Sequence, residues 1–330
     1  MPPLISICIP TYNRAAMLKE SIGSVVDQLS PDTEALVEIV VSDNASPDGT
    51  QAEVARMIEA YPGMAITYHR RRENIGADGN VLGVVGLATG RYCMILSDDD
   101  ILCDGALDTI IVALRASVPP DVLCCNMAPL DRSGEVDNPV HDITGDTALQ
   151  GKDAVLDYLG VWVTFLSTIV FRRDLLSIEG FDKYYGTSLS PCYYFLAVIA
   201  KAQTSIALAK VIVAIRANNT GGYSFFDVFV TGFDKLVNYA AQIGYDASVV
   251  GRLKDRNLTQ LVLPLLLQVK RHGGYGALRL GYFDGARRLI AHYPASRFMW
   301  LVVLPCLFTP APILNALLGA RSAAKRLLHR

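Results

Sequence analysis

The sequence predicts an α/β protein with a doubly wound parallel sheet, followed by a helical region. Over the first hundred residues, strand patterns alternate with amphipathic helix patterns, and this alternation is typical of βαβ units. Two predicted strands, Leu4–Ile9 and Val37–Val41, are nearly continuous apolar runs. Such runs indicate a parallel sheet covered on both faces. Ligands of open α/β sheets bind outside the carboxyl ends of the strands, so the polar segments that follow these strands are the candidate site.

The remaining elements follow from local patterns. A helix is expected from about Ala15 to Leu29, where apolar residues form one face. Further along the chain we expect a helix over 51–60, a strand over 65–69, a helix over 78–88, and strands over 92–96, 122–126, 165–171 and 211–215. The polar segment 133–146 is expected to be a surface loop. From about Ser224 the chain becomes helical and basic, so we divide it into an α/β domain over 1–222 and a helical region over 223–330.

The charge is unevenly distributed along the chain. After residue 250 there are 13 Lys and Arg against two acidic residues, a formal charge of +11 (13 − 2), whereas the preceding part carries 17 basic and 30 acidic residues. A basic region on an acidic body is expected to meet an anionic surface. Interleaved Leu, Val, Phe and Trp suit lipid better than a phosphate groove, so no nucleic-acid partner is expected.

Two late segments are strongly apolar. Leu258–Val269 is flanked by basic residues, and Arg297 and Arg321 bracket 23 residues without a charge. The second segment is long enough to cross a bilayer, but Pro305, with two later prolines, would break a straight helix. We expect a re-entrant or interfacial helical hairpin, peripheral or monotopic, with Lys and Arg on anionic headgroups. A buried helix pair in a soluble domain is the alternative.

The expected compartment is the reducing, cytoplasmic face of the inner membrane. The chain has seven cysteines without CxxC spacing, and its start leads directly into a predicted strand rather than into a signal peptide.

The run Ser97-Asp98-Asp99-Asp100 follows the apolar segment 92–96. Three adjacent carboxylates at a strand end repel one another and lose solvation unless a positive charge lies between them. Mg²⁺ and Mn²⁺ take oxygen ligands, usually one or two carboxylates plus substrate phosphates. The run therefore predicts a divalent-metal site. The alternative is an acidic turn in which Asp100 caps the helix expected near Asp104.

Five motifs occur in a fixed order: Ser6–Arg14, Val41–Thr50, Asn74-x-Gly76-x-x-x-Asn80, Ala88–Tyr92 and Ser97–Asp100, with weaker echoes at Phe171–Arg173 and Gly180–Asp182. With these motifs in register the chain resembles the family 2 glycosyltransferases of GT-A fold. It looks most like the bacterial branch that includes abequosyltransferase-like enzymes of O-antigen assembly. The resemblance implies a GT-A, Rossmann-like domain with a C-terminal helical, membrane-associating region. It also implies metal-dependent transfer from a nucleoside diphosphate sugar to a lipid-linked saccharide, with inversion.

The resemblance also implies roles for single residues. Pro10, Thr11 and Tyr12 would contact the nucleotide base, and Asp43 would accept from the base N–H. Asn13 or Arg14 would reach the ribose or phosphates, and Arg72 would lie at the diphosphate. Asn74, Gly76 and Asn80 would bind the sugar nucleotide, with Gly76 allowing close backbone approach. Asp98 would lie at the ribose or metal, Asp99 would be the main metal ligand, and Asp100 would lie on the sugar side. Structural alternatives remain: a strand stop and helix cap at Pro10-Thr11, an Asx turn at Asp43, and a solvated face at Arg72.

The general base is unassigned. Many relatives carry a Glu-Asp pair shortly after a Gly-Gly-Phe-Asp-like motif, but here residues 186–194 contain no acid. Asp182 is the nearest carboxylate, although the family motif makes it structural more often than catalytic. Two alternative functions therefore stay open: transfer onto polyprenyl phosphate, and a membrane-associated GT-A module without activity.

Overall fold

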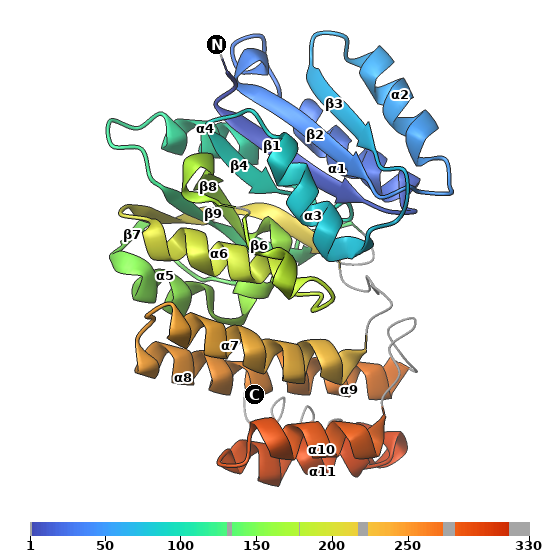
Figure 1. Ribbon diagram of the computed structural model, residues 1–330, viewed down its shortest axis with the longest axis vertical. Coiled ribbons are helices and arrows are strands. Elements are labelled where there is room, and N and C mark those ends of the chain that lie inside the picture. The colour runs from blue at the N-terminus through green and yellow to red at the C-terminus, as the bar shows by residue number, and fades with distance from the viewer. Residues whose placement is uncertain (1, 131–133, 178, 217–223, 273–280, 317–330) are drawn as a thin grey trace, which may run out of the picture. The chain divides into compact units, whose positions relative to one another are not determined.

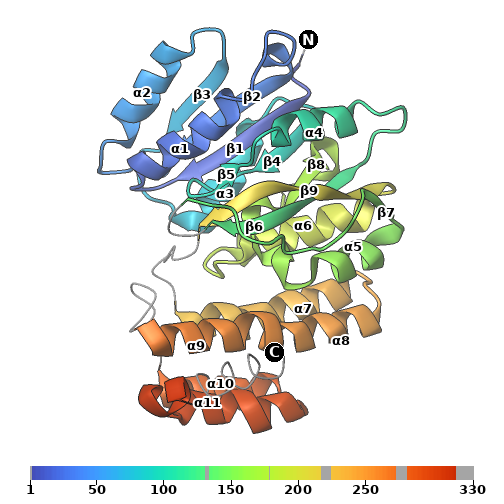
Figure 2. The ribbon, with the colours of Figure 1, turned by 180° about the vertical axis from the view of Figure 1, so that it is seen from behind.

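The computed structural model describes residues 2–130, 134–177, 179–216, 224–272 and 281–316 (Figures 1 and 2). The chain forms two compact units, of which the first comprises Met1–Ala217 and Gln242–Val249 and the second Asn218–Ala241 and Val250–Arg330. The domain boundary expected at 222/223 stays a prediction, because residues 217–223 lie outside the described ranges.

The first unit is built on one sheet with strand order β3-β2-β1-β4-β8-β6-β9-β5, in which β7 pairs with β9. The strands are β1 (Ile5–Thr11), β2 (Val37–Asp43), β3 (Ala65–Arg70), β4 (Tyr92–Ile95), β5 (Ile101–Leu102), β6 (Val122–Leu130), β7 (Thr147–Leu149), β8 (Ile169–Arg172) and β9 (Ser205–Arg216). Strands β1 to β4 run parallel to one another, whereas β8 runs antiparallel to both β4 and β6. The predicted parallel arrangement is confirmed for these four strands, and the rest of the sheet contains both parallel and antiparallel pairs.

Helices cover both faces of this sheet. They are α1 (Ala15–Val26), α2 (Thr50–Ala60), α3 (Gly76–Leu87), α4 (Ala106–Leu114), α5 (Gly151–Leu159) and α6 (Ser190–Lys201), with 3₁₀ turns η1 (Glu34–Leu36), η2 (Gly160–Thr164), η3 (Leu166–Thr168), η4 (Arg173–Leu175) and η5 (Asp182–Tyr184). Helices α3 and α6 lie on the face toward the viewer in Figure 1, and α1 lies on the opposite face, in front in Figure 2.

Burial of both faces of β1 explains its apolar sequence. Ile5, Ile7 and Ile9 are fully buried in a core that α1 and α4 complete. Helix α3 packs against β1 and β2 as well. Because both faces are covered, every residue of β1 and β2 is buried, as the continuous apolar runs predict.

One expected strand is wrong in extent. The segment expected to be a strand over 165–171 enters the sheet only at Ile169, because residues 160–168 form the turns η2 and η3. Strands β5 and β7 and helices α5 and α6 were not predicted from the sequence.

The second unit is helical and has its own core. Its elements are α7 (Phe233–Gln242) and α8 (Ala247–Arg256), except for Gln242 and the first three residues of α8, which are assigned to the first unit. They also include α9 (Leu263–His272), α10 (Tyr282–His292), α11 (Leu304–Phe308) and the π-helical turns η6 (Asp227–Gly232), η7 (Asn257–Val262) and η8 (Met299–Val303). Phe225, Leu258 and Leu289 are among the residues that fill this core. Within the described ranges, no helix is both long enough and apolar enough to span a membrane.

Two prolines lie directly after π-helical turns in this unit. Pro264 follows η7 and Pro305 follows η8, each as the second residue of the next α-helix. A proline lacks the N–H that would bond four residues back, and a wider turn lets the helix continue past it. The helix therefore continues past Pro305 but ends at Phe308, just before Thr309 and Pro310. The expected break of a straight helix is confirmed, and it lies at the second of the three prolines rather than at Pro305.

A buried carboxylate fixes the start of β4. Glu38, which is 6% exposed, accepts hydrogen bonds from Ser6 Oγ at 2.5 Å, Thr89 N at 2.6 Å, Thr89 Oγ1 at 2.8 Å and Gly90 N at 3.0 Å. Burial alone raises the pKa of Glu38, but these donors outweigh it and hold the pKa below its usual value. A Cβ on Gly90 would lie 2.6 Å from Ser6 Oγ. The Ala88–Tyr92 motif is thus a joint between β1, β2 and β4.

Glu38→Gln should lower the free energy of unfolding by roughly 2 kcal/mol at pH 7, because charge-assisted bonds are lost in a buried site. The folded pKa lies below the unfolded one, so this stabilisation is complete above about pH 4.5, the unperturbed value, and is lost as the pH falls through the folded pKa. Urea denaturation of wild type and variant from pH 7 to pH 3 measures the difference. Glu59→Gln, at an exposed site on α2, is the control, and a pH-independent difference would contradict the assignment.

Candidate functional site

The acidic run forms a turn after β4, beside the end of β1. Its carboxylates are nearly buried, with exposures of 4%, 4% and 6% for Asp98, Asp99 and Asp100. Thr11 Oγ1 donates to Asp98 Oδ2 at 2.7 Å, and Arg14 Nη1 donates to Asp98 Oδ1 at 2.7 Å. The same guanidinium nitrogen lies 3.5 Å from Asp99 Oδ2. One arginine therefore faces two of the three carboxylates.

Asp100 is held from the other side by Ser167, on η3. Ser167 Oγ donates to Asp100 Oδ2 at 2.7 Å and accepts from Ser97 N at 3.0 Å. Burial, together with the adjacent charge of Asp99, raises the pKa of Asp100 to about 8. The alternative that Asp100 caps the next helix is wrong, because Gly105 precedes α4 and no side chain makes a capping hydrogen bond there.

The chemistry of this donor set fits a hard divalent cation. Asp98 and Asp99 offer carboxylate oxygens. Burial raises the pKa of Asp98 in spite of Arg14, so the cluster lacks positive charge. Among the described residues, no group of three or more His, Cys, Asp or Glu side chains is arranged to hold a metal. A cation here would need further ligands from a bound diphosphate, which is the usual arrangement for Mg²⁺.

The segment at the end of β1 carries the residues expected at the nucleotide base. Pro10 and Thr11 are the last two residues of β1 and are buried. Tyr12 is 43% exposed, and Asn13 has a positive φ of 56° while its N–H donates to Ser46 Oγ at 2.9 Å. Arg14, the N-cap residue of α1, makes no side-chain capping hydrogen bond, and Ala15 N donates instead to Asp48 Oδ2 at 3.1 Å. The alternative that Thr11 caps the helix is therefore wrong, whereas the strand stop is confirmed, because β1 ends at Thr11. Contact with a base stays a prediction.

Asp43, the last residue of β2, is fully buried. Its Oδ1 accepts from Ser46 N at 2.9 Å, three residues on, so the carboxylate fixes the loop after β2, although an Asx turn would bond the residue two positions on. Its Oδ2 accepts from Tyr68 OH at 2.6 Å and lies 3.4 Å from Arg70 Nε. Burial and this hydrogen bond raise the pKa of Tyr68. Asp43 thus joins β2 to β3, and its contact with a base stays a prediction.

The two asparagines Asn44 and Asn74 close the loop after β3 against the loop after β2. Asn44 Nδ2 donates to Asn74 Oδ1 at 2.8 Å, and Asn44 Oδ1 accepts from Ile75 N at 2.9 Å. Gly76 has φ of 82°, and a Cβ there would meet no atom within 4 Å. The glycine is therefore required by its backbone angle, and close approach to a ligand stays a prediction.

Asn80, on α3, connects two strand ends to an arginine. Its Oδ1 accepts from Ser42 Oγ at 2.7 Å and Arg71 Nε at 3.1 Å, and its Nδ2 donates to Ser42 O at 2.8 Å and Thr11 O at 3.4 Å. These bonds fill the capacity of the amide. Asn80 therefore positions Arg71 and the ends of β1 and β2, and a direct bond to a sugar would have to displace one of these partners.

The three consecutive arginines that begin at the last residue of β3 have different environments. Arg70 Nη2 donates to Ser46 O at 3.0 Å, and Arg72 is exposed. Arg71 lies against α3, because a Cβ on Gly83 would be 1.6 Å from its Nη2. The sequence singled out Arg72, whereas Arg71 is the arginine held beside the site. Both Arg71 and Arg72 lie beyond the end of β3, where no strand alternation predicts the direction of a side chain.

A buried aspartate that sequence reasoning missed ties α3 to the segment before α6. Asp78 is 7% exposed and accepts from Ser188 N at 3.1 Å and Ser190 N at 3.3 Å. Ser188 has a positive φ of 58°. Tyr185, in the same segment, is 45% exposed and lies near Gly79 of α3. One turn of α3 therefore contacts both the strand ends, through Asn80, and this segment, through Asp78.

The two weaker motifs serve the fold. Phe181 packs edge-on against Tyr194 with ring centroids 4.3 Å apart. Arg172 Nη1 bonds Asp121 at 2.6 Å, and Arg173 Nε donates to Gly90 O at 2.8 Å. Asp182, the first residue of η5, is exposed.

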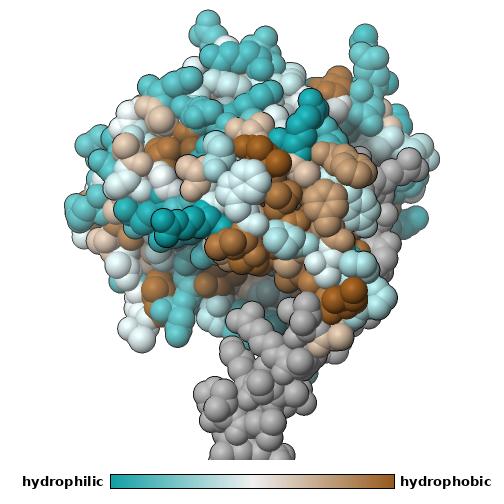
Figure 3. Space-filling view, turned by 90° about the horizontal axis from the view of Figure 1, so that it is seen from below, coloured by the Kyte–Doolittle hydropathy of each residue, from teal (hydrophilic) through white to brown (hydrophobic). Residues whose placement is uncertain are grey.

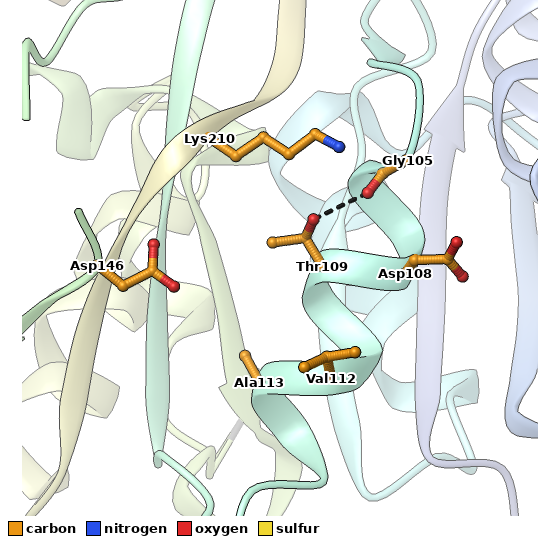
Figure 4. A pocket seen from close by; sticks show the side chains of 7 residues that line it. All are labelled: Gly105, Asp108, Thr109, Val112, Ala113, Asp146 and Lys210. Atoms are coloured by element: carbon orange, nitrogen blue, oxygen red, sulfur yellow. Dashed lines mark hydrogen bonds between the residues drawn. The ribbon is translucent and has the colours of Figure 1, made fainter. Parts of the chain in front are cut away.

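A shallow cavity of about 420 Å³ lies between α4 and β9 (Figure 4). Lys210 extends toward Gly105, and Asp108 points away from it. None of the residues expected to bind the donor lines this cavity.

The model of glycosyl transferase family 2 matches residues 6–177. The chain belongs to this family. Abequosyltransferase RfbV of Salmonella typhimurium is 32% identical over 207 residues, 59% of this chain and 61% of the relative. A GalNAc(5)-diNAcBac-PP-undecaprenol β-1,3-glucosyltransferase of Campylobacter jejuni is 31% identical over 109 residues, 33% of this chain and 34% of the relative. The matches thus span between about a third and three fifths of these relatives' lengths.

Solved structures confirm the predicted GT-A-like fold. S. aureus TarS in complex with UDP-GlcNAc superimposes with a TM-score of 0.60 at 16% identity, covering 88% of this chain and 82% of TarS. Mannosyltransferase PcManGT from Pyrobaculum calidifontis, in complex with GDP-Man and Mn²⁺, gives a TM-score of 0.53 at 18% identity, covering 96% of this chain and 88% of the other.

Asp78→Ala should loosen the segment before α6 and lower the free energy of unfolding by about 1 kcal/mol, because two backbone N–H groups lose their acceptor. Hydrogen exchange followed by mass spectrometry should show faster exchange over 186–192 and unchanged exchange in β1. Asp182→Ala, at an exposed neighbouring site, is the control. Wild-type exchange over 186–192 in Asp78→Ala would show that this carboxylate does not hold the segment.

Proposed function

We propose that this protein transfers a sugar from a nucleoside diphosphate sugar to a lipid-linked saccharide in cell-surface polysaccharide synthesis, with Mg²⁺ or Mn²⁺. The observation that carries the proposal is the convergence of Thr11, Asp43 and the acidic run at one edge of the parallel sheet. Family membership supports the reaction class. The TarS complex with UDP-GlcNAc and the PcManGT complex with GDP-Man and Mn²⁺ support the kind of donor and the metal.

The reaction breaks the bond between the anomeric carbon and the diphosphate oxygen, and the acceptor oxygen takes its place. The acceptor hydroxyl gives its proton to a base, and the nucleoside diphosphate leaves with the bonding electron pair. A divalent cation bound by Asp99 and Asp98 would stabilise the charge that develops on this leaving group. Arg14 and Arg71, held beside the site, would add positive charge at fixed positions, which lowers the barrier without reorganisation.

The proposed acceptor is attached to a lipid at the cytoplasmic face of the inner membrane. The name of the C. jejuni relative includes an undecaprenol-linked saccharide, and RfbV belongs to the branch that the motifs resemble. The basic composition of the second unit agrees with an anionic membrane surface as partner. The protein would then work as a peripheral or monotopic enzyme.

Nucleotide binding tests the donor site. In a thermal-shift panel of uridine, cytidine, thymidine and guanosine diphosphates, at least one should raise the Tm of the wild type by several degrees with Mn²⁺ and much less without it. Asp99→Asn should lose the Mn²⁺-dependent shift because it removes a ligand charge. Asp104→Asn, an exposed neighbour, should keep it. The proposal fails if no nucleotide shifts the wild type or if Asp99→Asn responds fully.

Asp182 is the only acid in the segment 180–194, and the proposal assigns the base to it. Asp182→Asn should then lower kcat on the order of 10²-fold or more while leaving the nucleotide-dependent thermal shift unchanged. The matched control is Asp174→Asn, at an exposed aspartate bonded to Arg172. Transfer at the wild-type rate in Asp182→Asn would exclude this assignment.

A further inference from the structure

The helix that spans residues 299–308 is apolar on all sides. Met299, Val303 and Leu307 are fully buried in the core of the second unit. The opposite side carries no charged residue, yet it is open: Leu301 is 75% exposed and Phe308 48%. A helix that is apolar all round is normally buried in protein or in lipid. Among the described residues, one side of this helix therefore has no partner of the kind that its composition requires.

A second helix extends this open side. Phe283, on α10, is 85% exposed, and its ring centroid lies 6.0 Å from that of Phe308. Trp300 and Ile313 are 44% and 54% exposed. We name these five residues, Phe283, Trp300, Leu301, Phe308 and Ile313, the apolar face. Figure 3 shows apolar side chains gathered on the side of the molecule where α10 and α11 lie.

Several polar groups at the ends of this helix are satisfied by the protein itself. Lys270 Nζ donates to the carbonyl oxygens of Cys306, Leu307 and Thr309 at 2.9, 2.7 and 2.6 Å. The last carbonyls of a helix have no partner within it, and here a lysine supplies one without water. Trp300 Nε1 donates to Pro294 O at 2.9 Å. The helix end can therefore enter an apolar medium without leaving these groups unpaired.

The charge of the surrounding chain selects an anionic partner. After Asp284 the remaining 46 residues (330 − 284) contain seven Lys and Arg and no acid. Arg297 is exposed close to the start of the helix over 299–308, and Arg287, on α10, is exposed and ion-paired with Asp284 at 3.0 Å. Like charge would oppose pairing of this surface with a second copy of itself. Aromatic and aliphatic side chains beside arginines are typical of proteins that lie in the headgroup region of anionic bilayers.

We infer that the second unit docks on an anionic lipid bilayer through the apolar face and does not cross it. The segment 299–308 has ten residues, about half of what a transmembrane helix needs. The apolar side chains would enter the bilayer by about 5–10 Å, with Arg287 and Arg297 at the phosphates. The inference deepens the proposed function by identifying the surface that would bring the enzyme to a lipid-linked acceptor.

Vesicle flotation tests the surface in the full-length protein. The wild type should float with phosphatidylcholine vesicles that contain phosphatidylglycerol, and more weakly with pure phosphatidylcholine. Leu301→Ser combined with Phe308→Ser should lower partitioning on the order of tenfold or more. Val112→Ser is the matched control, because Val112 is an apolar residue of the first unit that is 71% exposed. It should float like the wild type.

Tryptophan quenching by brominated lipid tests the orientation. The chain has two tryptophans, Trp162 and Trp300. In Trp162→Phe, the fluorescence emission of the remaining Trp300 should shift to the blue on vesicle binding and be quenched by the brominated lipid. In Trp300→Phe, the emission of the remaining Trp162, which packs against the core of the first unit, should not be quenched.

The inference is overturned if the wild type does not bind anionic vesicles, if the double variant binds as well as the wild type, or if Trp300 is not quenched. It is also overturned if size-exclusion chromatography without lipid shows an oligomer that the double variant dissolves, since the face would then be covered by another copy. The double variant should keep the Mn²⁺-dependent nucleotide shift. Vesicle binding without any nucleotide response would refute the proposed function and leave this inference standing.

Discussion

Burial of negative charge at the carboxyl ends of the parallel strands is the constraint on which the rest of the site depends. Asp43 and the three aspartates after β4 are nearly or fully withdrawn from water, and a buried carboxylate is costly unless donors surround it. The chain supplies these donors from neighbouring elements: Thr11 and Arg14 for Asp98, and Tyr68 for Asp43. The loops at this edge are held together by the bonds that these acids require.

The pKa values of buried acids are shifted in opposite directions at the two ends of the strands. Glu38, near the start of β2, receives four hydrogen bonds, and its pKa is held below the usual value. Asp98 and Asp100 have pKa values above the usual value, because burial outweighs their partners. A satisfied acid strengthens the fold, whereas a cluster short of positive charge is prepared to receive it from a ligand. This contrast distinguishes the structural end of the sheet from the candidate site.

The second unit is a helical unit whose sequence has few polar residues. Its own core buries one side of α9, α10 and α11. π-helical turns accommodate Pro264 and Pro305, and Lys270 bonds carbonyls at the end of α11. The excess of apolar residues remains on the surface. Exposed apolar patches are typical of protein or membrane interaction sites, and this one agrees with the proposed docking on lipid.

The sequence by itself determined the order of strands and helices in the first hundred residues, the family, and the neighbourhood of the site, because apolar periodicity and short motifs are local properties. Only the tertiary structure decided which side chains meet there. Arg71 rather than Arg72 lies against α3, and Asn80 makes its hydrogen bonds to the strand ends. Ser167, from a distant segment, bonds Asp100. These outcomes depend on which strands become neighbours and which face a helix covers, and such long-range pairings leave no periodic trace in the chain.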